Sequence, residues 1–162
     1  MTHRDSGELR NYFDAHLRVS LELPADWDIG STDEFPLVVL APEASGFRAN
    51  AGFSDRALRP STQEGFVAAI EQLKSEQAAD FGHYQLVSER RVVQDGCPGY
   101  LLRCRWDLEQ GPTRVAQVAA LYAVGTERLV EVHCTALAEL ESMYFTMFRR
   151  LLHSLRFIPV TD

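Results

Sequence analysis

Four segments with strand character follow one another without a helix between them, and this run constrains the fold more than any other feature. The segments cover residues 84–93, 97–107, 114–124 and 127–135. The breaks between them have the composition of tight turns: Asp95-Gly96, Gln110-Gly111-Pro112 and Gly125-Thr126. Because parallel neighbours need a long crossover connection, strands joined this closely must pair antiparallel. The sequence therefore predicts a four-stranded meander.

Further elements precede and follow the meander. Alternating leucine and valine from Leu17 to Leu23 predict a half-buried strand that ends at Pro24, and residues 36–42 and 47–53 are shorter strand candidates around a Ser45-Gly46 turn. One amphipathic helix begins at Ser61, where Glu64 completes a capping box, and stops near Gly82. A second covers residues 138–154. The expected fold class is α+β, with an antiparallel sheet of about six to seven strands flanked by helices.

The third strand of the meander is apolar on both sides. One side carries Val115, Ala119, Leu121 and Ala123, broken by Gln117, and the other carries residues such as Val118 and Tyr122. A strand of this kind is usually central, with a helix covering each face of its sheet. The alternative is that a partner, including a second copy of the chain, completes one face and contacts Leu121.

Length and charge limit the classes of function. A chain of 162 residues is long enough for one domain with its own core, which we expect over residues 12–158 after a flexible segment 1–11. The 16 basic and 23 acidic residues give a net charge of −7, which opposes attraction to nucleic acids or acidic lipids.

The compartment is predicted from the N-terminus and the cysteines. Residues 1–11 lack the apolar core of a signal peptide, and no stretch is apolar for long enough to insert in a membrane. The three cysteines are odd in number and widely spaced, which suits a reducing compartment. We therefore expect a cytoplasmic protein, although a chain whose export signal had been removed would look the same.

Cys104, His133 and Cys134 are the nearest approach to a catalytic or metal centre. A nucleophilic thiol needs an imidazole within hydrogen-bond reach, and a structural zinc site needs four ligands in short paired spacings. Strand alternation predicts that both cysteines point into the core while His133 points the opposite way. We therefore expect no catalytic residues, no metal, no cofactor and no enzymatic activity.

A polar sheet face and one tryptophan remain as candidate contact sites. Alternation predicts one face that carries Arg103, Arg105, Glu131 and His133, which either is solvated or receives a carboxylate or phosphate. With Gln117 and Leu121 these residues form the expected ligand or partner face. Trp27 is predicted to be a core aromatic or, alternatively, an anchor at the rim of a cleft.

Several short motifs occur in an order that resembles the DcrB-like domains of the PsbP-like superfamily. They span roughly residues 13 to 157. The motifs are Leu23-Pro24-x-x-Trp27, Asn50, Tyr100-Leu101-Leu102 with Trp106, Gln117, and Ser154-Leu155-Arg156-Phe157.

The resemblance implies an α/β/α sandwich and a protein that acts by binding. Members of the superfamily include a photosystem subunit, a Ran-binding import factor, envelope lipoproteins and chaperones that shield apolar helices of secreted toxins. The first hypothesis is thus a non-catalytic cytosolic module that binds a protein partner, such as a chaperone or adaptor for a secreted effector's apolar segment. The alternative is a binding protein or enzyme that takes a small anion on the polar sheet face.

Overall fold

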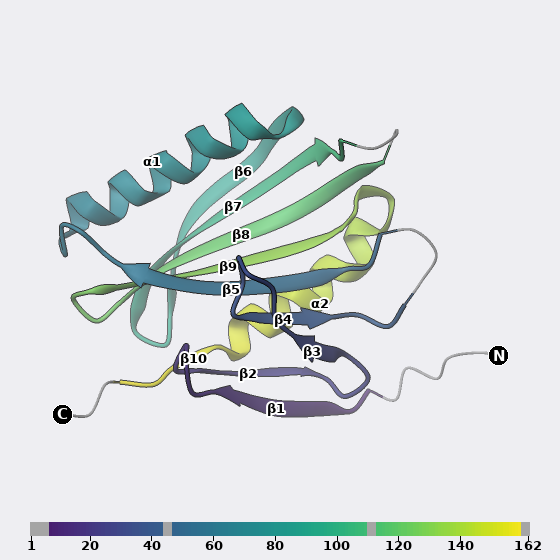
Figure 1. Ribbon diagram of the computed structural model, residues 1–162, viewed down its shortest axis with the longest axis horizontal. Coiled ribbons are helices and arrows are strands. Elements are labelled where there is room, and N and C mark those ends of the chain that lie inside the picture. Colours follow the sequence, from purple (N-terminus) through teal and green to yellow (C-terminus); the bar gives the residue numbers. More distant parts are fainter. Residues whose placement is uncertain (1–6, 44–46, 110–112, 160–162) are drawn as a thin grey trace.

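A seven-stranded antiparallel sheet forms the centre of the molecule (Figure 1). The computed structural model describes residues 7–43, 47–109 and 113–159. In spatial order the strands are β3 (Asp28–Gly30), β4 (Leu37–Leu40), β5 (Asn50–Ala57), β9 (Arg128–Leu137), β8 (Arg114–Val124), β7 (Cys97–Asp107) and β6 (Gly82–Gln94). The meander is confirmed, because β6, β7, β8 and β9 pair consecutively and antiparallel.

A helix covers each face of this sheet (Figure 1). On one face lies α1 (Gln63–Asp80), and on the other lies α2 (Glu141–Ser154), which follows a short 3-10 turn at Ala138–Leu140. A separate three-stranded sheet of β1 (Leu9–Asp14), β2 (Val19–Pro24) and β10 (Arg156–Phe157) packs on the α2 side. The α+β class and the sheet flanked by helices are confirmed.

Strand β8 is central and buried on both sides, as its composition predicts. Ala116, Ala120 and Tyr122 belong to the core under α2, whereas Ala119 and Leu121 belong to the core under α1. Each core is shielded by the chain's own helix. The structure therefore supports the covered-sheet interpretation over completion of this face by a partner.

The structure corrects three expectations about boundaries. The expected flexible segment 1–11 is too long, because Leu9–Asn11 already pair with β2. The capping box is wrong by one residue: Thr62, not Ser61, caps α1 by accepting a hydrogen bond from the amide of Gly65. The helix ends at Asp80 rather than at Gly82, which opens β6. The turns expected at Ser45-Gly46 and Gln110-Gly111-Pro112 lie outside the described residues.

No helix within the described ranges is both long and apolar enough to cross a membrane.

Candidate functional site

Arg103 and Arg105 already hold a carboxylate, and that carboxylate belongs to the chain itself. Both project from β7 toward α2, where Glu141 opens the helix. Arg105 Nε and Nη2 donate to Glu141 Oε2 at 3.0 and 2.8 Å, and Arg103 Nε and Nη2 donate to Oε1, the first at 2.9 Å. The Arg103 guanidinium also stacks over Phe145. This pair of arginines therefore anchors the start of α2 to the sheet.

The predicted polar face is wrong as a single surface, because the sheet separates its members. Arg103 lies opposite Val118 of β8 and faces α2, whereas Glu131 and His133 of β9 face α1. Alternation along each strand decides the face of a side chain only once the pairing between strands is known. Here Arg103 of β7 is level with Cys134 of β9, so the neighbouring His133 points to the opposite face. No ligand can touch all four residues at once.

Glu131 and His133 form a small ion cluster of their own on the α1 side. The His133 ring lies 3.4 Å from the Glu131 carboxylate, and Arg56 also reaches that carboxylate at 3.4 Å. Burial opposes ionisation of Glu131, but His133 and Arg56 outweigh it and hold the pKa of the carboxyl below its usual value. The cluster borders a hollow of about 490 Å³ whose lining also includes Asn50 and Thr135.

Gln117 is the centre of a buried hydrogen-bond network below α1. Its amide donates to Thr135 Oγ1 at 3.0 Å, and its carbonyl accepts from Gln77 Nε2 of α1 at 3.0 Å. Tyr84 of β6 completes the chain by donating to Gln77 at 3.0 Å. The network fixes where the C-terminal half of α1 sits on the sheet. Leu121, which was expected to contact a partner, is fully buried in the core under the same helix.

Cys104, Cys134 and His133 do not converge. The two cysteines are both buried, as predicted, but they face opposite sides of the sheet: Cys104 lies under α1, on the same side as His133, and Cys134 lies in the α2 core. Burial raises the pKa of the Cys104 thiol to about 12, despite a hydrogen bond with Tyr84, and it also raises that of Cys134. The described residues hold no group of three or more metal-ligating side chains placed to bind an ion.

Trp27 is a core residue, which rules out its use as a rim anchor. The side chain is 2% exposed and its ring meets Phe148 of α2 edge-on, with the ring centres 6.3 Å apart. The turn that leads to it is closed by a 3.0 Å hydrogen bond from the Trp27 amide to the carbonyl of Pro24. The Leu-Pro-x-x-Trp motif thus has a structural role.

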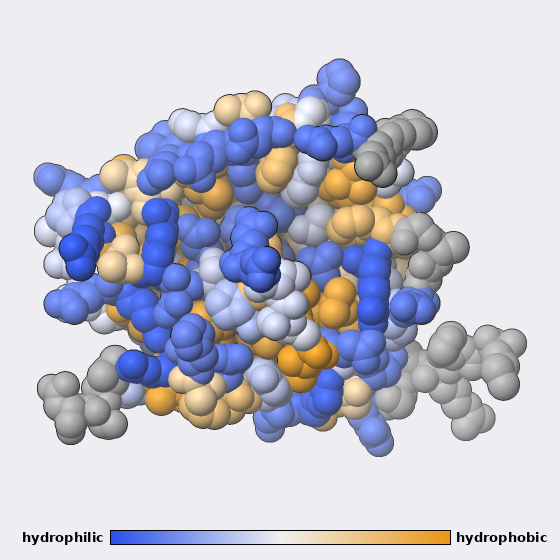
Figure 2. Space-filling model, viewed as in Figure 1, coloured by the Kyte–Doolittle hydropathy of each residue, from blue (hydrophilic) through white to orange (hydrophobic). Residues whose placement is uncertain are grey.

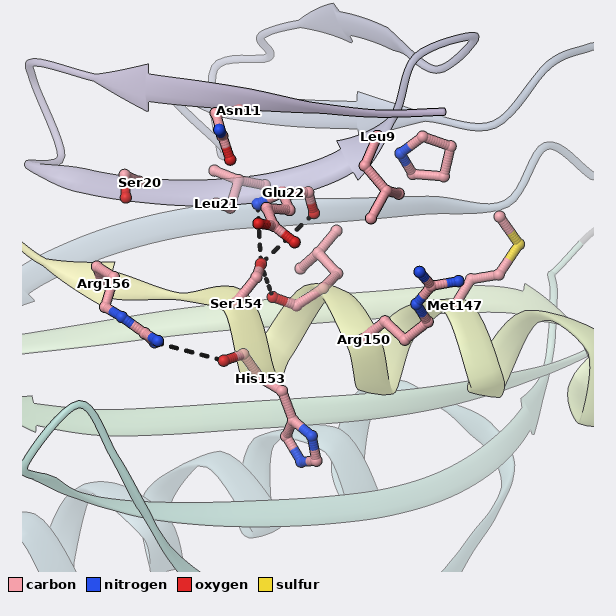
Figure 3. Close-up of a pocket in the computed structure, with 12 residues that line it drawn as sticks. Leu9, Asn11, Ser20, Leu21, Glu22, Met147, Arg150, His153, Ser154 and Arg156 are labelled. Carbon is pink, nitrogen blue, oxygen red and sulfur yellow. Dashed lines mark hydrogen bonds between the residues drawn. The ribbon is translucent and has the colours of Figure 1, made fainter. Parts of the chain in front are cut away.

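The C-terminal Ser154-Leu155-Arg156-Phe157 motif also has a structural role (Figure 3). Ser154 Oγ accepts from the Glu22 amide of β2 at 2.8 Å and donates to the Leu151 carbonyl at 2.6 Å, which joins the end of α2 to the small sheet. A hollow of about 450 Å³ lies beside this junction. Its lining mixes Leu9, Glu22, Met147 and Arg150, and the His153 ring points away from it (Figure 3).

A larger hollow, which we name the α2 cavity, lies between α2 and strands β6, β7 and β8. It has a volume of about 730 Å³. Its apolar side chains are Val92, Val93, Leu101, Val118, Phe145 and Leu152. Ser88, Gln94 and Tyr122 add polar groups, and the basic side chains are Arg90, Arg103, Arg149 and His153.

On the opposite side, the α1 groove lies between the N-terminal half of α1 and the nearby ends of the strands. It has a volume of about 610 Å³ and a mostly apolar lining that includes Phe66, Val67, Ile70, Val93 and Tyr100. Elsewhere, on the face seen in Figure 2, hydrophobic residues form small patches that hydrophilic side chains interrupt.

Apart from Arg103, the charged residues that line these two hollows were missed by sequence reasoning. Arg90 and Arg91 are neighbours on β6, and alternation sends the first toward α2 and the second toward α1. Arg149 and Arg150 are neighbours on α2 and line different hollows. The sequence feature that could have pointed to them is the presence of these two arginine pairs in a chain that is acidic overall.

Comparison with known proteins identifies the fold. No family model matches the chain, and no curated protein matches it. Among solved structures, cyanobacterial PsbP (CyanoP) from Synechocystis sp. PCC 6803 has a TM-score of 0.70 at 13% identity, over 92% of each chain. LpqN, involved in cell envelope biogenesis of Mycobacterium tuberculosis, has a TM-score of 0.69 at 10% identity, over 94% of this chain and 91% of its own.

A third similar structure is PA94 of Pseudomonas aeruginosa, a protein of unknown function. Its TM-score is 0.60 at 12% identity, over 96% of this chain and 100% of its own. At these identities the likeness shows the fold alone, which is PsbP-like, as the motifs indicated.

Proposed function

We propose that this PsbP-like chain is a non-catalytic protein-binding module whose α1 groove receives an apolar segment of a partner. The observation that supports this most is the exposure of apolar side chains at the groove. Val67 of α1 is 41% exposed and Val93 of β6 is 75% exposed, and the half-buried Phe66 lies on the same helix. Apolar side chains gathered at a groove and left in water are typical of interaction sites.

The orientation of the groove favours a helical segment. It crosses the ends of several strands, from Arg91 and Val93 of β6 over Pro98 and Tyr100 of β7 to Ala123 of β8. A segment that lies across strands cannot extend their ladder, so its backbone must satisfy its own hydrogen bonds. An amphipathic helix meets that condition and offers apolar anchors at a spacing of three and four residues.

Charge at the rim adds a second requirement. Arg91 lines the groove and has no hydrogen-bond or ion-pair partner among the residues that the structure describes. Glu71, also on the rim, lies 3.7 Å from Lys74. We expect the partner helix to carry a carboxylate next to its apolar face, where Arg91 can bind it.

The finer proposal is a cytoplasmic chaperone or adaptor that covers the apolar segment of a secreted client. Such a segment would aggregate if it were left exposed, and a groove of this kind would shield part of its surface. The three cysteines are unpaired, which agrees with a reducing compartment.

Site-specific photo-crosslinking in the native host tests the proposal. A photoreactive amino acid replaces Val67 or Val93 at the groove, and Met143 serves as the control because it is an apolar residue of α2 that is 53% exposed. We expect a crosslinked partner from both groove positions and none from position 143. The crosslinked peptide should map to one amphipathic apolar segment, which a synthetic peptide then reproduces in a binding titration.

Three outcomes would contradict the proposal. The absence of any adduct at the groove, or equal adducts at position 143, would show that the groove is not a specific site. Crosslinks between two copies of this chain would instead identify the groove as a homodimer interface.

A further inference from the structure

We propose that the α2 cavity is a separate binding site for an amphiphilic anion, which is a small molecule with one oxyanion head group on an apolar body. The two hollows share Val92 and Val93 of the edge strand β6, but they lie on opposite faces of the sheet and are lined by different arginines, so the inference can be tested separately from the α1 groove. A volume of about 730 Å³ is within the range of small-molecule sites.

Cations concentrate at this cavity although the whole chain is acidic. Arg90 comes from β6 and Arg149 from α2, so two separate elements each contribute a guanidinium. Neither has a hydrogen-bond or ion-pair partner among the described residues. Arg103 donates to Glu141 through Nε and Nη2, so its Nη1 group remains available to donate to a ligand. The described lining contains no carboxylate. In a chain of net charge −7, such a cluster marks a place where an anion is favoured.

The wall behind these arginines is built for an apolar body. Leu101 and Val118 lie on neighbouring strands of the sheet, and Phe145 and Leu152 face them from α2. Leu101 and Val118 are only partly buried, so part of their apolar surface is open to the cavity. A ligand that covered this surface would gain about 25 cal/mol for each Å² removed from water.

Tyr122 offers the cavity a hydroxyl that can bind a polar ligand. The side chain lines the cavity and is 1% exposed, and its hydroxyl has no hydrogen-bond partner among the described residues. Among the described residues, the fully enclosed side-chain polar atom that lacks a partner is Arg128 Nη2 and not this hydroxyl, so the Tyr122 oxygen keeps some accessible surface, where a ligand in the cavity can reach it. Burial raises the pKa of this phenol, which therefore stays protonated and can donate to an oxyanion.

Guanidinium forks bind carboxylates and phosphates alike, and the chemistry shared by both is a head group with several oxygens. We expect the head group to lie between Arg90 and Arg149 at the opening, with the apolar body on the wall of Leu101 and Val118. Dodecanoate and dodecyl phosphate represent the two head groups, and dodecanol has the same chain without the charge.

Isothermal titration calorimetry with the whole protein tests the site. We expect saturable one-to-one binding of dodecanoate or dodecyl phosphate, whichever head group fits, and much weaker binding of dodecanol. Arg90→Gln and Arg149→Gln should each reduce affinity about tenfold, as expected when one hydrogen bond to a charged group is lost. Tyr122→Phe, which keeps the ring, should reduce it by a smaller factor.

The chain offers two matched controls. Arg91→Gln changes the next residue of β6, which faces the α1 groove, and Arg150→Gln changes the next residue of α2, which lines the hollow of Figure 3. Both should leave anion binding unchanged. Arg91→Gln should weaken only the binding of the partner helix to the α1 groove, so the two proposals can fail separately.

Circular dichroism of each variant checks that the fold is intact. The inference is overturned if neither anion binds saturably, if dodecanol binds equally well, or if Arg91→Gln weakens binding as much as Arg90→Gln. Unchanged affinity in Tyr122→Phe would contradict the role assigned to the hydroxyl.

Discussion

At the scale of single residues, the cysteines that could have been reactive are held in poorly reactive, buried or half-buried positions. Cys104 and Cys134 are fully buried on opposite faces of the sheet, and Cys97 is half-buried beside the turn at Asp95. Burial raises the pKa of all three thiols, so the thiolate is scarce at neutral pH.

This difference in burial predicts a difference in reactivity. In the folded protein at pH 8, iodoacetamide should alkylate Cys97 slowly and should leave Cys104 and Cys134 unmodified for as long as the fold persists. Mass spectrometry of tryptic peptides measures the three sites separately. In guanidinium chloride all three should react at similar rates. Rapid alkylation of Cys104 in the native state would show that the Gln77–Gln117 network opens readily.

At the scale of elements, the arginine pair on β7 decides where α2 begins. Glu141 is almost fully buried, and each of its oxygens accepts two bonds from one guanidinium. Its substitution would leave two positive charges side by side without the group that separates them.

We expect Glu141→Gln to lower the free energy of unfolding by about 1–3 kcal/mol, a range reduced from that of fully buried pairs because both arginines are partly exposed. Urea unfolding measures it. Glu139→Gln, two residues earlier and exposed, is the matched control and should have almost no effect. In a double-mutant cycle, Arg105→Gln should cost less on the Glu141→Gln background than on the wild type. Strict additivity would mean that the two side chains do not interact.

Elements with a clear period were predictable from the sequence, and those with an ambiguous period were not. The meander and β8 followed from turns and alternation. In α2, however, apolar side chains surround much of the helix: Met143 is 53% exposed, whereas Phe145 and Phe148 are buried. Periodicity alone cannot choose between overlapping stripes. The short strands β3 and β10 have too few residues for any pattern, and tertiary pairing alone defines them.

The candidate site was predictable only in part, for a related reason. Arg103 and Arg105 were recognised as able to bind a carboxylate, but the sequence does not show that Glu141 supplies it. The relative phase of β7 and β9 depends on their pairing through β8, so Glu131 and His133 were assigned to the wrong face.

At the scale of the whole molecule, one sheet is shared by two cores. Trp27 lies in the core on the α2 side, and Trp106 lies on the α1 side, where its ring stacks on Phe81 with centres 4.2 Å apart. Side chains of β8 enter the cores on both sides of the sheet. Unfolding one side would therefore expose apolar side chains of the other.

The two tryptophans provide a test of the expected single domain over residues 12–158. Trp27→Phe and Trp106→Phe each leave one fluorescent reporter, on opposite sides of the sheet. Within each variant, the fluorescence transition in urea should coincide with the transition followed by far-ultraviolet circular dichroism. Separate midpoints would mean that the two sides unfold as independent units.

The order Arg90-Arg91-Val92-Val93 on β6 has one more consequence. Each face of the strand presents an arginine followed by a valine, and a slip of the strand by one residue would present the same pair of residue types again. The doublets are thus ambiguous about alignment. The two-residue turn at Asp95-Gly96, with positive φ at both residues, fixes the alignment of β6 on β7, and that alignment also brings the Glu89 carboxylate to Lys74 and Tyr100. The geometry of one tight turn thereby decides which arginine of the doublet each hollow receives.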